Sequence, residues 1–325
     1  MRARYVLPNY RVAVVGAGAI GGYYGAKLAY FGRDVHFLMR GDLRDVRRFG
    51  LRIRSKSGNI RLAKVNCYRS TEDIGPCDLV LIAVKTTGNA DLLHLIPPLL
   101  HERTMLLTLQ NGLGNEELLS AAFGAERVLG GLCFVCLNRV SPGVIEHYDH
   151  GRLIVGEYQR YPAARTHDIS WEFKRCGVVC TVTENLMRER WRKLIWNIPF
   201  NGLAITGGGI DTAAILARGE LRALTLALME EVITAANKYG CMLPSAVALE
   251  QIRRTETMGA YKPSTLIDFE AGRPLEVEAI WGEPLRRALA AGAVVPHLAA
   301  VYDEIKSIDE ERQRRASEES EPKVV

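Results

Sequence analysis

The sequence lacks a long apolar run and has few cysteines. A membrane-spanning helix needs about 20 consecutive, predominantly apolar residues, and no such stretch occurs among the 325 residues. The first residues carry basic side chains but not the apolar segment of a secretory signal. Seven scattered cysteines are too few for a disulfide scaffold in a chain of this length. The sequence therefore predicts a cytoplasmic protein with reduced thiols and no membrane partner.

Positive and negative charges nearly balance. Lysine and arginine number 42 and aspartate and glutamate number 37, which gives a formal net charge of +5. This excess does not indicate a nucleic-acid partner, and an anionic small ligand would suit it equally well. The seven histidines show no ligand spacing, and the C-x-x-C pair Cys133 and Cys136 lies inside an apolar run without a second pair at zinc spacing. We expect both cysteines on a buried strand and no metal site.

The first half of the chain alternates between strand and helix patterns. The strands are predicted at 11–16, 34–40, 78–85 and 104–110, and the helices at 19–31, 88–96 and 115–122. Such alternation predicts a mostly parallel sheet that helices cover on both faces.

A hairpin and a group of short strands are added to this pattern. Residues 51–63 alternate in polarity around Ser57-Gly58-Asn59, which predicts a hairpin. Residues 128–156 predict short strands with turns at 141–143 and at His150-Gly151, and a last strand is expected at 177–182.

The composition changes near residue 184, after which nearly every segment has helical periodicity. A chain of 325 residues is long enough for two domains. We expect an α/β domain at 11–183 and an all-helical domain at 184–307, with disordered segments at 1–10 and at the polar stretch 308–325. The apolar surface of the helical half is compatible with a homodimer.

A glycine-rich segment joins the first predicted strand to the first predicted helix. Its pattern is G-x-G-x-x-G, formed by Gly16, Ala17, Gly18, Ala19, Ile20 and Gly21. In this context the first glycine permits a tight turn, the second lets the backbone approach a pyrophosphate, and the third lets helix and strand pack closely. The start of the helix adds positive potential. The segment predicts a Rossmann-type dinucleotide-binding domain.

The end of the second predicted strand indicates which dinucleotide is bound. NAD sites usually carry an acidic residue there for the ribose hydroxyls, whereas an arginine suits the 2′-phosphate of NADP. Arg40 occupies this position and favours NADP. Asp42 is the rival indication for NAD, but we expect it to cap the helix that begins at residue 43.

Two further side chains follow predicted strands. In open α/β sheets, ligands bind at the carboxyl ends of the strands. Lys85 ends one strand and Asn111 follows the next, within Gln110-Asn111-Gly112. Both are candidates for binding the cofactor, although Lys85 can equally be a solvated loop lysine and Asn-Gly is a common turn pair.

Three polar residues recur at helical spacing in the second half. Lys193, Asn197 and Asn201 follow one another at intervals of four, so they form one polar stripe on a helix. Bulky apolar residues occupy the other faces. The spacing alone is consistent with the wall of a pocket or with a solvent-facing stripe.

Taken together, these motifs resemble the ketopantoate reductase (2-dehydropantoate 2-reductase) family. The resemblance also includes Lys262-Pro263-Ser264 and Leu275-Glu276, and the order and rough spacing agree from about residue 11 to 305. It implies an N-terminal Rossmann domain, a C-terminal helical domain and reduction of a 2-oxo acid by NADPH.

The resemblance also implies roles for individual residues. Lys193 would donate the proton, and Glu276 would lie near the nicotinamide and this lysine. The substrate would be bound by Lys193 with Asn111, Asn197, Asn201 and Ser264. The cofactor would be bound by Gly16 through Gly21, with Arg40, Lys85, Asn111 and Glu276.

The sequence departs from the family pattern beside the expected pocket. Members commonly have proline after the third residue of the stripe, whereas this chain has Gly202 there and Pro199 upstream. A longer loop follows at 207–214, and a further substrate asparagine has no match. The expected substrate is therefore ketopantoate or a similar branched 2-oxo acid. The alternatives are a related NAD(P) dehydrogenase acting on another 2-oxo or 3-hydroxy acid, and a non-catalytic NADPH sensor.

Overall fold

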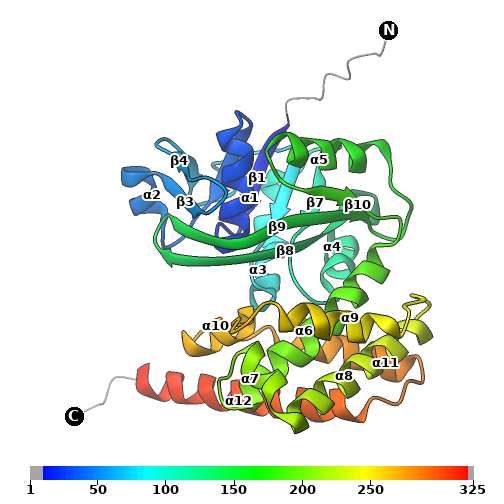
Figure 1. The fold of residues 1–325 in the computed structure, drawn as a ribbon. Coiled ribbons are helices and arrows are strands. Elements are labelled where there is room, and N and C mark those ends of the chain that lie inside the picture. Colours follow the sequence, from blue (N-terminus) through cyan, green and yellow to red (C-terminus); the bar gives the residue numbers. More distant parts are fainter. Residues whose placement is uncertain (1–9, 321–325) are drawn as a thin grey trace. The chain divides into compact units, whose positions relative to one another are not determined.

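The computed structural model describes residues 10–320 and divides the chain into two compact units (Figure 1). The sheet unit contains the chain up to Gln110 together with Asn115–Leu186. The helical unit contains Asn111–Gly114 and the chain from Met187 onward. The predicted fold class is confirmed. The predicted extension at 1–10 lies, apart from Tyr10, outside the described residues.

Six parallel strands form the centre of the sheet unit. In spatial order they are β8 (Val128–Ser141), β7 (Met105–Thr108), β6 (Leu79–Ile82), β1 (Arg11–Val15), β2 (Asp34–Leu38) and β5 (Asn66–Tyr68). Numbered along the chain and read from β5, this is the order 3-2-1-4-5-6 of the dinucleotide-binding fold. The strand order reverses between β1 and β6, where such sheets bind their ligands.

Helices cover both faces of this sheet. The helices are α1 (Ala19–Tyr30), α2 (Leu43–Phe49), α3 (Asn89–Leu95), α4 (Asn115–Phe123) and α5 (Ala164–Arg175), with short 3-10 turns at Thr86–Gly88, Pro97–Leu99 and Ala125–Arg127. Val12 and Val14 enter one apolar cluster, whereas Ala13 and Val15 enter another. Since alternate residues of a strand face opposite sides, the sheet is buried on both faces as predicted.

The predicted hairpin is present, but the strands after residue 128 are longer than predicted. β3 (Leu51–Ser55) and β4 (Ile60–Leu62) pair antiparallel, and β3 joins β9 (Val144–Glu157). β8 and β9 are 14 residues each and run side by side (Figure 1). The predicted turn at His150-Gly151 is wrong: both residues have positive φ within β9, where the register shifts by a bulge. A short strand β10 (Cys180–Val182) pairs parallel with β9.

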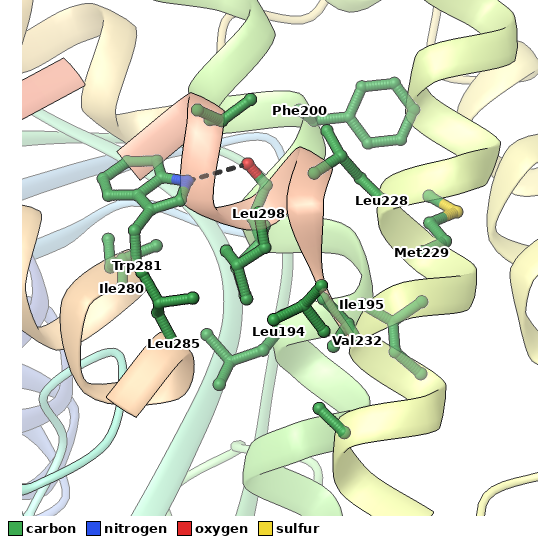
Figure 2. Close-up of a cluster of buried hydrophobic side chains, with 14 of the residues drawn as sticks. Leu194, Ile195, Phe200, Leu228, Met229, Val232, Ile280, Trp281, Leu285 and Leu298 are labelled. Carbon is green, nitrogen blue, oxygen red and sulfur yellow. Dashed lines mark hydrogen bonds between the residues drawn. The ribbon is translucent and has the colours of Figure 1, made fainter. Parts of the chain in front are cut away.

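The helical unit is built around one apolar core. Its helices are α6 (Leu186–Thr206), α7 (Thr212–Ala217), α8 (Gly219–Lys238), α9 (Ala246–Glu256), α10 (Ser264–Glu270), α11 (Glu283–Ala290) and α12 (Pro296–Ser320), with a π-helical turn at Glu278–Gly282. Figure 2 shows Leu194, Ile195, Met229, Trp281 and Leu298 packed together in this core. None of these described helices has the length and apolar character to cross a membrane.

The prediction that residues 308–325 are disordered is wrong for 308–320, which continue helix α12. Asp309 is 6% exposed and accepts a hydrogen bond from Gln313 at 2.6 Å. Arg312 lies over the Phe269 ring, 4.3 Å from its centroid, and donates to the Phe269 carbonyl at 2.8 Å. Buried contacts to α10 therefore order a segment whose composition alone predicts disorder. Residues 321–325 lie outside the described part of the chain.

Candidate active site

The glycine-rich loop has the close packing that its pattern predicts. Gly16 has φ of +97°, and a Cβ atom there would lie 2.4 Å from the backbone nitrogen of Val84. A Cβ atom on Gly21 would lie 2.2 Å from the carbonyl oxygen of Gly16. Only glycine fits at either position, and the loop is thereby fixed against the segment that follows β6.

Gly18 differs from the other two glycines because the space that its Cβ atom would occupy is open. No described atom lies within 4 Å of the place where its Cβ atom would stand. Gly18 directly precedes α1 and accepts the hydrogen bond from Gly22 N–H at 2.9 Å. The first N–H groups of a helix have no partner within the helix and attract anions. An open approach beside a helix start fits the pyrophosphate of a dinucleotide.

Arg40 lies just beyond β2, as predicted, and forms an ion pair. Its Nη2 atom donates to Oδ2 of Asp91, in the first turn of α3, at 2.7 Å. The predicted capping role of Asp42 is wrong, because its side chain makes no capping bond to α2. Its carboxylate instead pairs with Arg139 and accepts from Gly143 N–H at 3.1 Å. With its carboxylate bound in this way, Asp42 becomes a weaker indication of an NAD site.

A chain of side-chain amides holds the segment that carries Lys85. Gln110 donates through Nε2 to the Val84 carbonyl at 3.1 Å and to Oδ1 of Asn89 at 2.6 Å. Asn89 in turn donates to Oδ1 of Asn115 at 3.0 Å. Lys85 itself is exposed and directly follows Val84, which packs against Gly16. Sequence reasoning missed Asn89 and Asn115, although Gln110 was part of the Gln-Asn-Gly motif.

Asn111 folds with the helical unit rather than with the strand that precedes it. Gly112 has φ of +81°, and a Cβ atom there would lie 2.2 Å from the Ala279 carbonyl oxygen. Leu113 donates its N–H to the same oxygen at 2.9 Å and is 2% exposed in the helical core. The domain prediction placed residues 111–114 in the α/β half. The local sequence pattern does not show that Leu113 packs into a core formed by residues far along the chain.

Asn111 meets Lys193 within the helical unit. The Lys193 Nζ atom donates to Oδ1 of Asn111 at 2.7 Å, although the two residues are 82 positions apart. Lys193 is half-buried on α6. Asn197 and Asn201, further along the predicted stripe, are 8% and 1% exposed. The alternative of a solvent-facing stripe is therefore wrong.

Asn201 connects α6 to the start of α10. Its Oδ1 atom accepts from Thr265 N–H at 3.1 Å, and its Nδ2 atom donates to the Asn197 carbonyl at 2.9 Å. Ser264, the first residue of α10, is exposed and lies directly before Thr265. The structure thus places the Ser264 segment beside the buried end of the polar stripe.

Glu276 lies close in sequence to the segment that receives Asn111. It is 6% exposed and shortly precedes the π-helical turn Glu278–Gly282. Ala279 of that turn accepts the bond from Leu113. Single π-helical turns occur often at functional sites.

The departure at Gly202 has a packing explanation. A Cβ atom there would lie 2.8 Å from Cγ1 of Val301 and 3.3 Å from Nε1 of Trp281. Glycine therefore allows α12 and Trp281 to lie close to α6.

The expected strand position of Cys133 and Cys136 is confirmed on β8, and neither thiol is in a disulfide. Within residues 10–320, no group of three or more histidine, cysteine or acidic side chains is placed to hold a metal ion.

Comparisons with known proteins agree with this arrangement. Residues 12–160 match the family model "Ketopantoate reductase PanE/ApbA", and residues 185–309 match its C-terminal counterpart. A 2-dehydropantoate 2-reductase of a Nostoc species is 39% identical over 304 residues, which cover 92% of this chain and 95% of that protein.

Solved structures are also similar over nearly the whole chain. The 2-dehydropantoate 2-reductase of Geobacter metallireducens is 44% identical with a TM-score of 0.90, over 92% of this chain and 99% of that one. The enzyme of the same name from Methylococcus capsulatus is 33% identical with a TM-score of 0.85, over 93% and 97% of the two chains. This chain, with its dinucleotide-binding sheet and its half-buried lysine–asparagine pair, belongs to the ketopantoate reductase family of oxidoreductases that act on CH–OH groups.

Proposed function

We propose that this protein reduces 2-dehydropantoate, or a similar branched 2-oxo acid, to the 2-hydroxy acid with NADPH. Family membership supports the reaction type. The observation that carries the proposal is the 2.7 Å hydrogen bond from Lys193 to Asn111, because it orients an ammonium group on a half-buried helix face that continues into buried amides.

Most of the residues proposed to bind the cofactor lie in the sheet unit. Gly18 and the first turn of α1 would receive the pyrophosphate, and Arg40 would bind the 2′-phosphate that distinguishes NADP from NAD. Lys85, held beside the glycine loop through Val84, would bind the cofactor phosphates or ribose, and Asn111 and Glu276 complete the proposed set. When bound, the nicotinamide ring supplies the hydride.

Lys193 is proposed as the proton donor. Reduction of a carbonyl group leaves negative charge on its oxygen, which an ammonium group stabilises electrostatically and then protonates. Asn111 fixes the direction of Nζ, and the Glu276 carboxylate is proposed to lie near the ammonium group and to help orient it. General acid catalysis of this kind contributes roughly 10²- to 10⁴-fold in rate.

Asn197, Asn201 and Ser264 are proposed to bind the substrate oxygens. A carboxamide nitrogen carries two N–H groups, so Asn201 has a second N–H besides the one that it donates to Asn197. Ser264 is exposed at the start of α10, where a carboxylate would accept from its hydroxyl group. Holding the acid in one orientation presents a single face of its carbonyl carbon.

Steady-state kinetics test the proposal directly. The purified protein should oxidise NADPH in the presence of ketopantoate, and Lys193→Ala should lower kcat by about 10²- to 10⁴-fold with little change in NADPH binding. Equal kcat values for the two proteins would remove Lys193 from the reaction. A panel of other branched 2-oxo acids identifies the preferred substrate, and tight NADPH binding without turnover of any acid would indicate a sensor instead.

A further inference from the structure

We propose that Asp91 determines how strongly this site prefers NADPH over NADH, by its ion pair with Arg40. The inference rests on the proposed function, in which Arg40 binds the 2′-phosphate. Asp91 Oδ2 lies 2.7 Å from Arg40 Nη2, and the side chains of Arg40 and Asp91 are 72% and 52% exposed. Asp91 is a specificity determinant here, because it acts on the cofactor through charge.

The topology brings these two residues together. Arg40 follows β2, and Asp91 lies in the first turn of α3, which follows β6 after the 3-10 turn at Thr86–Gly88. β1 pairs with both β2 and β6, so both loops emerge at the same edge of the sheet as the glycine loop. This edge is where a Rossmann-type sheet receives the adenosine half of its cofactor.

The geometry leaves Arg40 able to bind a second anion. A guanidinium group has five N–H donors in a planar fork, and the bond to Asp91 uses one nitrogen. A 2′-phosphate could therefore accept from the guanidinium while the bond to Asp91 persists. It would then lie close to the Asp91 carboxylate, and two like charges at such a distance repel each other.

NADH has no 2′-phosphate, so this repulsion does not arise when NADH binds. Its ribose has a neutral hydroxyl group where NADP has the phosphate, so the positive charge of Arg40 gains no anionic partner from the ligand. Asp91 already compensates that charge. The carboxylate therefore weakens NADPH binding and leaves NADH binding nearly unaffected. It thereby reduces the difference in affinity between the two cofactors. Since both side chains are well exposed, salt screens the repulsion. Removing the charge of Asp91 is therefore expected to change the preference for NADPH only several-fold.

Asp91→Asn tests this inference because it preserves the shape of the side chain and removes its charge. The ratio of kcat/KM for NADPH to kcat/KM for NADH should rise about three- to tenfold, and the rise should shrink at high salt. Glu126→Gln is the matched control: it removes an exposed carboxylate that precedes β8, at the amino ends of the parallel strands rather than at their carboxyl ends. That variant should leave the ratio unchanged.

Arg40→Ala separates the inference from the function on which it rests. This variant should lose NADPH affinity selectively, and Asp91→Asn should have a smaller effect in the Arg40→Ala background. An unchanged or lowered ratio in Asp91→Asn would overturn the role of Asp91 while Arg40 keeps its own. An undiminished effect in the double variant would overturn the part of the inference that assigns this role to the ion pair with Arg40. Equal losses for both cofactors in Arg40→Ala would overturn the 2′-phosphate assignment and the inference with it.

Discussion

Lys193 Nζ and Asn111 Oδ1 are 2.7 Å apart because Asn111–Gly114 pack with the helical unit, although the residues before and after them belong to the sheet unit. Gly112 and Leu113 make this docking possible through their contacts with Ala279. The proposed proton donor is thus oriented by a loop that follows β7 in the chain.

Replacing Asn111 by alanine should lower kcat because the ammonium group loses its oriented acceptor. Hydrogen bonds to charged groups contribute about 1.5–3 kcal/mol, so a loss of roughly 10- to 100-fold is expected. In the Lys193→Ala background, Asn111→Ala should reduce kcat much less, since both changes remove the same interaction. Fully additive losses in this double-mutant cycle would show that Asn111 acts independently of Lys193.

The glycine loop allows the folding role and the binding role of two neighbouring residues to be separated. Gly18→Ala places a methyl group where no described atom lies within 4 Å, so thermal stability should be unchanged or slightly higher. The same methyl group would stand where the pyrophosphate approaches, and the Kd for NADPH, measured by calorimetry, should rise at least tenfold.

Gly16→Ala is the matched comparison, because its methyl group would meet the Val84 backbone at a residue with φ of +97°. Two effects are combined there, steric overlap and positive φ, and the protein should unfold at a lower temperature. If Gly18→Ala bound NADPH like the parent protein, the cofactor would not approach this loop through Gly18.

Local patterns in the sequence were enough to predict the dinucleotide-binding half. The glycine spacing and the apolar strands each have a physical reason that operates within a few residues. The same holds for Lys193, Asn197 and Asn201, whose common helix face follows from their spacing. What the spacing could not decide was whether this face is buried, because burial depends on segments far away in the chain.

The errors came from interactions at long range. Asp42 looks like a helix cap, but its partners are Arg139 and Gly143, about 100 positions further along the chain. Residues 308–320 have a composition typical of disorder, but Phe269 and Leu275 supply contacts that order them. The pair between Arg40 and Asp91 also could not be predicted from local sequence. It depends on the strand order, in which β1 lies between β2, which precedes Arg40, and β6, which precedes Asp91.

Trp281 should stabilise the helical unit through a single polar contact in its apolar core. Its indole N–H donates to the Ile198 carbonyl at 3.0 Å, and the side chain is fully buried (Figure 2). Trp281→Phe removes this donor and leaves unfilled volume, so a loss of about 2–4 kcal/mol in the free energy of unfolding is expected. Trp171→Phe is the control, because Trp171 is 55% exposed on α5 and its replacement should cost less than about 0.5 kcal/mol. Denaturant titration of both variants distinguishes the loss of a buried, hydrogen-bonded tryptophan from a general effect of losing tryptophan.

Glu157 should make the stability of the sheet unit depend on pH. Burial alone would raise the pKa of this carboxyl group, but hydrogen bonds from Arg165 and Thr166, with the charge of Arg160, outweigh burial and hold the pKa below its ordinary value. Arg165 donates to Oε1 at 2.9 Å, and Thr166 donates to the same oxygen at 2.6 Å. Because the folded-state pKa is lowered, this stabilisation is fully present above the unfolded-state pKa of about 4.3 and is lost as pH falls through the folded-state value.

Glu157→Gln should therefore destabilise the protein by about 1.5–3 kcal/mol at pH 7, because it removes the anion that accepts the hydrogen bonds of Arg165 and Thr166. The difference from the parent protein should begin to shrink as the pH falls below the unfolded-state pKa of about 4.3, and it should vanish once the pH is below the lowered folded-state pKa, where the parent carboxylate is protonated too. Glu146→Gln, on the same strand, removes a half-exposed carboxylate that lies 3.5 Å from Arg54, and should cost less than about 1 kcal/mol at either pH. Unfolding free energies measured between pH 7 and pH 3 decide the point: a gap between Glu157→Gln and the parent that stays constant over this range would mean that the charge of Glu157 does not stabilise the fold.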